Sequence, residues 1–215
     1  MPLNRYPSIN LYNQKNEVVD KSEERFEQYL VYKYIKPDGV VLEIGGRYGI
    51  VSNTINLLLD NKTQHIVIEP DKSVIGALNR NKRAFRSEFI IVDKAISNSD
   101  LFLNPDKLGS NTTTIKQASS IDIETITAHD FFEEFPLEFN VLIVDCEGCF
   151  ENFIIENFIY LNKLELIIFE KDGEFDKGNY DNVYKILEAA NFIKCEIIEL
   201  GDPEGFKQVW IKKLV

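Results

Sequence analysis

The chain is poor in cysteine, histidine and basic residues, and it contains no long apolar run. Its 215 residues include three Cys, two His, and 24 Lys and Arg against 35 Asp and Glu, a formal net charge of −11. Three cysteines cannot build the framework of a disulfide-stapled domain. The acidic balance disfavours general binding to the phosphate backbones of nucleic acids. No apolar run approaches the ~20 residues that a membrane-spanning helix needs.

The first residues also lack the apolar segment of a secretory signal, so we expect a cytoplasmic protein. Hydrophobic residues make up 44% of the chain and aromatic residues 12%, which excludes a disordered or fibrous chain. No linker, repeat or low-complexity tract divides the sequence. We therefore expect a single domain over residues 1–215.

Short apolar runs alternate with amphipathic segments along most of the chain. This alternation is typical of a parallel β-sheet with helices on both faces. The predicted core strands are Val40–Ile44, Ile66–Glu69, Phe89–Val92, Val141–Asp145 and Leu166–Glu170. The last two strands, Phe192–Leu200 and Phe206–Lys212, are joined by a predicted hairpin turn. The expected fold class is α/β, a Rossmann-like, doubly wound and mostly parallel sheet that ends in an antiparallel hairpin.

Two segments fall outside this alternation. Residues 1–37 form a polar arm and a first helix, for which Asp20 or Ser22 is the expected cap. Residues 97–139 are rich in Ser, Thr and Asn, with short strands expected at Leu101–Leu103 and Ile121–Ile123 and a helix near residues 129–135. We expect both segments to shape a ligand pocket.

Carboxylates stand at the C-terminal end of nearly every predicted core strand. Ligands of a doubly wound sheet bind at this edge. The residues found there are Glu43–Gly49, Glu69, Asp93 and Lys94, Asp145–Gly148, and Glu170–Asp172. We favour a clustered site over a chance assortment of polar strand ends.

The first of these loops is glycine-rich and runs from Glu43 to Gly49. Glycine allows a tight turn and close approach of a ligand, and the following helix directs its positive end there. The loop lacks the G-x-x-x-x-G-K of a phosphate-binding loop, and Arg47 stands where a dinucleotide fingerprint needs glycine. The Glu43 carboxylate would repel a pyrophosphate and favour a cation or an amino group.

Glu69 ends the second core strand, where a carboxylate can accept both hydroxyls of a ribose. A ligand that carries a ribose and prefers negative surroundings fits S-adenosylmethionine, whose sulfonium and ammonium groups are positive.

These elements together resemble the FkbM-like S-adenosylmethionine-dependent methyltransferases. The matching pieces are Val41–Gly49, Ile68–Pro70, Lys94–Ile96, Ile143–Gly148 and Ile168–Glu170, of which the D-x-E-G at Asp145–Gly148 is the most specific. The family usually has Asp at position 43, Ala-Asn at positions 46 and 47, and a further Glu at position 150, where this chain has Phe. The resemblance implies a seven-stranded sheet with an antiparallel last strand, and O-methylation of a sugar, a glycan or a related small molecule.

The expected cofactor-binding residues are Glu43, Gly45, Gly46, Gly49, Glu69, Asp93, Lys94, Ala95 and Asp145. An alcohol needs a base or a metal to take its proton. We expect Asp145 to position the cofactor or the acceptor hydroxyl, and Glu147 or His129 to accept the proton. Mg²⁺ held by Asp145, Glu170 and Asp172 stays open as an alternative.

Several other interpretations compete with this one. The C-x-x-C of Cys146 and Cys149 is compatible with a redox pair, although we favour coincidence. His65 is expected at the surface, and His129 in a polar segment is more often only solvated. At the level of function, a NAD(P)-dependent oxidoreductase and a catalytically inactive methyltransferase-like binding protein stay open.

Overall fold

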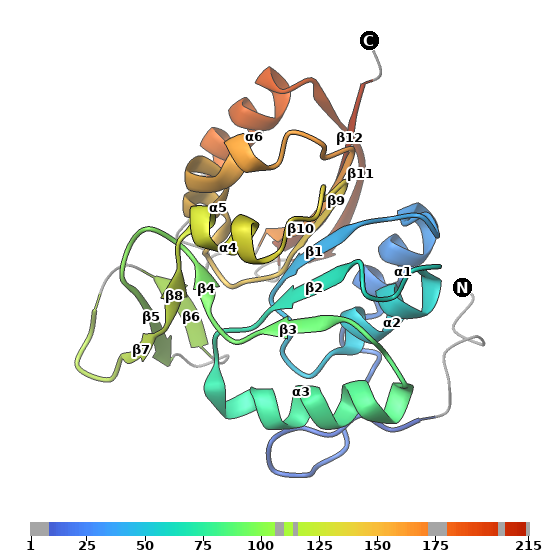
Figure 1. Cartoon of the computed structure of the whole chain (residues 1–215), viewed down its shortest axis with the longest axis vertical. Coiled ribbons are helices and arrows are strands. Elements are labelled where there is room, and N and C mark those ends of the chain that lie inside the picture. Colours follow the sequence, from blue (N-terminus) through green and yellow to red (C-terminus); the bar gives the residue numbers. More distant parts are fainter. Residues whose placement is uncertain (1–8, 106–109, 114–115, 172–179, 202–204, 214–215) are drawn as a thin grey trace.

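The computed structural model describes residues 9–105, 110–113, 116–171, 180–201 and 205–213. Its centre is a seven-stranded sheet in the order β11-β12-β10-β9-β1-β2-β3 (Figure 1). The strands are β1 (Val41–Ile44), β2 (His65–Ile68), β3 (Ile90–Val92), β9 (Val141–Val144), β10 (Leu166–Lys171), β11 (Phe192–Gly201) and β12 (Gly205–Lys212). The first five run parallel, and β12 pairs antiparallel with both β10 and β11. The predicted sheet is confirmed, including the antiparallel pairing of its last two strands, while residues 202–204 of the predicted turn lie outside the described residues.

Helices cover both faces of this sheet, as the apolar strand sequences predict. The helices are α1 (Arg25–Tyr34), α2 (Ile50–Leu58), α3 (Lys72–Phe85), α4 (Ala128–Glu134), α5 (Phe150–Asn157) and α6 (Tyr180–Ala189), with a 3₁₀ turn at Phe158–Tyr160. Within β1, Leu42 belongs to the core with α4, α5 and α6, while its neighbour Val41 belongs to the core with α1 and α2. Within the described residues, no helix is long and apolar enough to cross a membrane.

The segment after β3 builds two small sheets, which lie together on one side of the molecule (Figure 1). Strand β4 (Ala95–Ile96) pairs with β8 (Thr125–Ile126), and β5 (Leu101–Pro105) lies between β6 (Ser110–Thr113) and β7 (Ile121–Ile123). The predicted strands at residues 101–103 and 121–123 and the predicted helix near 129–135 are confirmed. Strands β4, β6 and β8 were not predicted because two to four residues show no clear periodicity.

The predicted cap of the first helix is wrong. The side chain of Asp20 accepts a hydrogen bond from the backbone N–H of Ser22, which forms a separate turn. Helix α1 therefore begins later, at Arg25, with Glu24 at its N-cap position. Before this turn the arm lies on α3, where the Asn81 side chain pairs with both backbone polar groups of Tyr12. The helix start places Glu24 and Glu27 at the edge of the sheet.

Candidate functional site

A cavity of about 320 Å³ lies at the carboxyl edge of β1, β2, β9 and β10. This volume is at the lower end of the range of small-molecule sites. Loops after the strands supply most of its lining, the N-cap and first turn of α1 supply Glu24 and Glu27, and the small sheets supply Leu101 and Leu103. The cavity is therefore closed by both segments that the sequence places outside the regular alternation.

Most of the predicted cofactor residues line this cavity, and three do not. Those that line it are Glu43, Gly45, Gly46, Glu69, Ala95 and Asp145. Gly49 instead caps α2 with a φ of 82°, which a glycine adopts without strain. Asp93 pairs with Lys72 at 2.6 Å near the surface, and Lys94 beside it is also outside the described lining. Of the three predicted cofactor residues that follow β3, only Ala95, the first residue of β4, lines the cavity.

Gly45 brings the first loop against the end of β9. Its φ is 95°, and a Cβ at this position would lie 1.7 Å from the carbonyl oxygen of Asp145. The backbone N–H of Asp145 donates to the carbonyl of Ile44 at 2.9 Å. Only glycine permits this contact, so it fixes the position of Asp145 relative to the first loop.

The Glu43 side chain lies behind the first loop, and other side chains of the protein bind both of its carboxylate oxygens. Its side chain accepts a hydrogen bond from the Ser52 hydroxyl at 2.9 Å and lies 2.8 Å from Nε2 of His65. His65 is completely buried, so the prediction of a surface histidine is wrong. The residue is the first of β2, and a carboxylate inside the sheet requires a polar partner there.

Glu69 is held at the opposite wall by backbone groups. Its Oε2 accepts from the N–H of Arg47 at 2.6 Å, and its Oε1 accepts from the N–H of Asp71 at 2.9 Å. Burial raises the pKa of Glu69, and these two hydrogen bonds act in the other direction. The carboxylate is thus oriented and keeps lone pairs for a pair of ligand hydroxyls.

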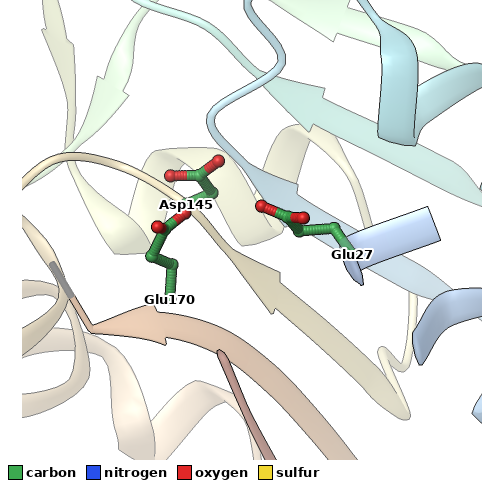
Figure 2. Close-up of side chains that lie close together, drawn as sticks. All are labelled: Glu27, Asp145 and Glu170. Carbon is green, nitrogen blue, oxygen red and sulfur yellow. The ribbon is translucent and has the colours of Figure 1, made fainter. Parts of the chain in front are cut away.

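Three carboxylates from separate elements meet at the other end of the cavity. We define Glu27 of α1, Asp145 after β9 and Glu170 of β10 as the acidic cluster; each offers an oxygen within 4.8 Å of the others (Figure 2). The ammonium of Lys207, from β12, pairs with Glu27 and with Glu170. Of the predicted metal ligands, Asp145 and Glu170 belong to this cluster, while Asp172 lies outside the described residues.

Glu24 and Glu27 were missed as site residues, because acidic side chains at a helix start are explained by the helix dipole alone. Burial, followed by the charges of Asp145, Glu27 and Glu43, raises the pKa of Glu24 to about 8. Lys207 was also missed, because lysine is seldom buried without a charge partner and the neighbouring Phe206 and Gln208 do not indicate one.

The loop between β9 and α5 contains Glu147, which lines the cavity and has a φ of 50°. A disulfide joins Cys146 to Cys149 in this loop, so the interpretation of their C-x-x-C spacing as a coincidence is wrong. His129 is not brought to this loop. It lies in the first turn of α4 with a mostly exposed side chain, 3.6 Å from Glu133, and is absent from the described cavity lining.

Comparison of the chain with known proteins identifies its fold but not its family. No protein-family profile and no curated protein matches the chain. Among solved structures, precorrin-6y C5,15-methyltransferase from Geobacter metallireducens matches with a TM-score of 0.57 at 13% identity, over 97% of this chain and 99% of that one. The chain has the Rossmann-like methyltransferase fold.

Two further structures share this fold. A protein from Klebsiella pneumoniae, provisionally named an O-methyltransferase, matches with a TM-score of 0.53 at 12% identity, over 91% of this chain and 82% of that one. A Streptococcus pneumoniae protein, provisionally named a tRNA (m1A22) methyltransferase and solved with S-adenosyl-L-methionine, matches with a TM-score of 0.56 at 13% identity, over 88% and 75%. Likeness at this level establishes the fold, and the reaction has to be inferred from the site.

Proposed function

We propose that the protein is an S-adenosylmethionine-dependent O-methyltransferase, similar to the FkbM-like enzymes, that acts on a hydroxyl of a sugar, a glycan or a related small molecule. The observation that carries the proposal is the orientation of Glu69 at the end of β2, in a cavity lined by carboxylates, on a methyltransferase fold. The net charge of −11 favours a small-molecule acceptor over a nucleic acid.

The cavity residues fit this donor. Glu69 would accept the ribose hydroxyls, and the first loop would approach the amino-acid part of the donor at Gly45 and Gly46. Ala95, Leu101 and Leu103 offer apolar surface for a base in the same cavity. When bound, the donor supplies a methyl group activated by a sulfonium, which favours the negative surroundings of Asp145.

The residues after β9 would then handle the acceptor. Asp145 holds the donor or the acceptor hydroxyl in line, and such alignment contributes several kcal/mol to catalysis. A carbon–oxygen bond forms at the acceptor while the carbon–sulfur bond of the donor breaks. Glu147 takes the proton that the hydroxyl releases, a role worth about 10²- to 10⁴-fold in rate. His129 is not needed for this step, because it lies on α4 away from the cavity lining.

Calorimetric titration separates the three candidate functions at the level of the ligand. Binding of S-adenosylmethionine, without binding of NAD(P)H, supports the methyltransferase. The reverse result would establish the oxidoreductase. Donor binding without methyl transfer to any acceptor, in a mass-spectrometric screen of sugars, lipids and peptides, would point to the inactive binding protein.

Substitution of Glu147 tests the proposed base. Glu147→Gln should lower methyl transfer by about 10²-fold or more and leave the donor affinity nearly unchanged. Turnover equal to that of the unaltered protein would exclude Glu147 as the base.

We further propose that the reaction needs no divalent metal. The Lys207 ammonium already neutralises part of the charge of Glu27 and Glu170, so two of the three candidate ligand groups are engaged. Methyl transfer should therefore be insensitive to a chelator. Loss of activity with a chelator, restored by Mg²⁺, would reinstate a metal site at Asp145 and Glu170.

A further inference from the structure

We propose that the acceptor carries a protonated amine beside its reacting hydroxyl, as amino sugars and aminocyclitols do, and that the acidic cluster binds this amine. The inference rests on the proposed function and narrows its substrate class.

The first observation is the convergence of three carboxylates at one end of the cavity. The cluster residues Glu27, Asp145 and Glu170 come from α1, from the loop after β9 and from β10, and their carboxylates point toward one another (Figure 2). Like charges held this close repel in a partly buried site; burial and the charge of Asp145 raise the pKa of Glu27, and a bound cation would relieve the same repulsion. A single cation from the protein, Lys207, contacts the cluster within the described residues.

The second observation is an unsatisfied oxygen in the cluster. Glu27 is only 7% exposed, and its Oε1 pairs with Lys207. Its Oε2 is inaccessible to solvent and has no hydrogen-bond partner among the described residues. A buried carboxylate oxygen without a donor is costly, and a ligand N–H group would supply the missing partner once the Glu27 side chain turns this oxygen toward the cavity.

The charge of the whole cavity points in the same direction. Its described lining includes eight carboxyl groups, of which Glu24, with a pKa of about 8, is protonated at neutral pH, and two cationic side chains, Arg47 and Lys207. The proposed donor brings a sulfonium and an ammonium together with one carboxylate, so most of the excess negative charge is left for the acceptor.

The position of the cluster separates it from the proposed ribose site. Glu69 follows β2, while Glu170 belongs to β10, and β1 and β9 lie between these strands. Adjacent strands are about 4.8 Å apart, so three steps across the sheet cover about 14 Å. Glu170 therefore lies beyond Asp145 as seen from the ribose site, on the side where an acceptor would approach the methyl group.

An amine suits this cluster better than a metal ion. Lys207 shares Glu27 and Glu170, and a divalent ion among the same carboxylates would lie beside its ammonium with strong repulsion. A protonated amine carries one charge and several N–H donors, which match Oε2 of Glu27 and the carboxylate of Asp145.

The test compares acceptors in pairs that differ only in the amine. The protein is saturated with S-adenosylhomocysteine, and binding of glucosamine, N-acetylglucosamine, an aminocyclitol and its N-acetyl derivative is measured by ligand-observed NMR. Methyl transfer to the same four compounds is measured with labelled donor. We expect at least one amine to bind about tenfold more tightly than its N-acetyl partner, the size of one charge-assisted hydrogen bond.

Matched variants locate the effect. Glu27→Gln and Asp145→Asn should remove the preference for the amine, while Glu23→Gln, an exposed neighbour with the same charge change, should retain it. The circular-dichroism spectrum and a cooperative thermal unfolding transition show that each variant is folded, because Asp145 itself belongs to the proposed donor site.

Failure of the inference is distinct from failure of the proposed function. Donor binding without a preference for any amine overturns the inference alone. Saturable Mn²⁺ binding that Glu27→Gln abolishes would also overturn it, because the cluster would then be a metal site. Absence of any binding of the donor or its by-product overturns the proposed function.

Discussion

The Nε2 atom of His65 lies 2.8 Å from the Oε2 atom of Glu43, and both side chains are almost completely buried. Glu43 lies within β1, whose four residues are all buried, close to the end from which the donor is expected to be held. Its two oxygens are engaged by Ser52 and His65. Glu43 therefore contributes to the cavity mainly as a fixed negative charge behind the first loop, and His65 determines how that charge is held.

Loss of this pair should be costly. His65→Ala removes a hydrogen-bond partner and leaves a buried carboxylate oxygen unpaired, which costs about 1–3 kcal/mol, in addition to the loss of the imidazole's packing against Phe89. Urea denaturation measures the free energy of unfolding. The other histidine of the chain supplies the control, because His129→Ala changes an exposed side chain and should alter stability by less than about 0.5 kcal/mol. Equal effects of the two substitutions would show that the buried pair has no stabilising role.

Two glycines should respond in opposite ways to the same substitution. Gly45→Ala places a methyl group on the Asp145 carbonyl and should prevent the first loop from packing against β9, so we expect loss of donor binding and of several kcal/mol of stability. Gly76 lies within α3, and a Cβ added there would meet no atom within 4 Å. Gly76→Ala should therefore stabilise the protein by up to about 1 kcal/mol. Thermal unfolding and calorimetry with the donor measure both effects, and a tolerated Gly45→Ala would contradict the close contact.

Glu24 should make stability depend on pH. Its pKa is about 8 in the folded protein, against an ordinary value of 4.5. The unfolded chain therefore releases this proton at a lower pH than the folded protein does. As a result, the free energy of unfolding falls as the pH rises from the ordinary pKa toward the pKa in the folded protein. As the pH rises from 4.5 to about 8, the unaltered protein should lose more stability than Glu24→Gln. Parallel stability profiles of the two proteins would show that Glu24 titrates normally.

Reduction of the disulfide should loosen the loop that contains Glu147. Opening a crosslink around four residues costs about 2 kcal/mol in the chain-entropy description. We therefore expect dithiothreitol, or Cys146→Ser, to lower the free energy of unfolding by up to that amount. Cys195→Ser is the control, since Cys195 is a free cysteine on β11. A protein whose stability is the same in oxidising and reducing buffer would show that the crosslink does not contribute.

The sequence predicts the central sheet well because its signals are local. Runs such as Leu166–Phe169 are apolar at every position, which is typical of strands buried on both faces. The small strands β4 and β8 are two residues long, and their pairing depends on positions 30 residues apart in the chain, Ala95 with Thr125. No local pattern can encode such a contact.

The candidate site was predicted where a residue follows a core strand and was missed where a side chain arrives from elsewhere. Asp145 and Glu69 belong to the first group. Glu27 and Lys207 belong to the second: one comes from α1 and the other from β12, and they meet only because both elements pack against β10. His65 shows the same limit, since its burial depends on the carboxylate in the neighbouring strand.

The place of β12 in the sheet has a consequence for biosynthesis. This strand is inserted between β11 and β10, and it carries the ammonium that bridges Glu27 and Glu170. A ribosome makes all three carboxylates of the cluster before it makes Lys207. Until the hairpin docks, a nascent chain has an open β10 edge, which invites pairing with other chains, and an uncompensated patch of negative charge. The docking of β12 therefore closes the sheet and neutralises the cavity in the same late step of folding. A chain truncated before β12 should lack both the closed sheet and the neutralised cavity.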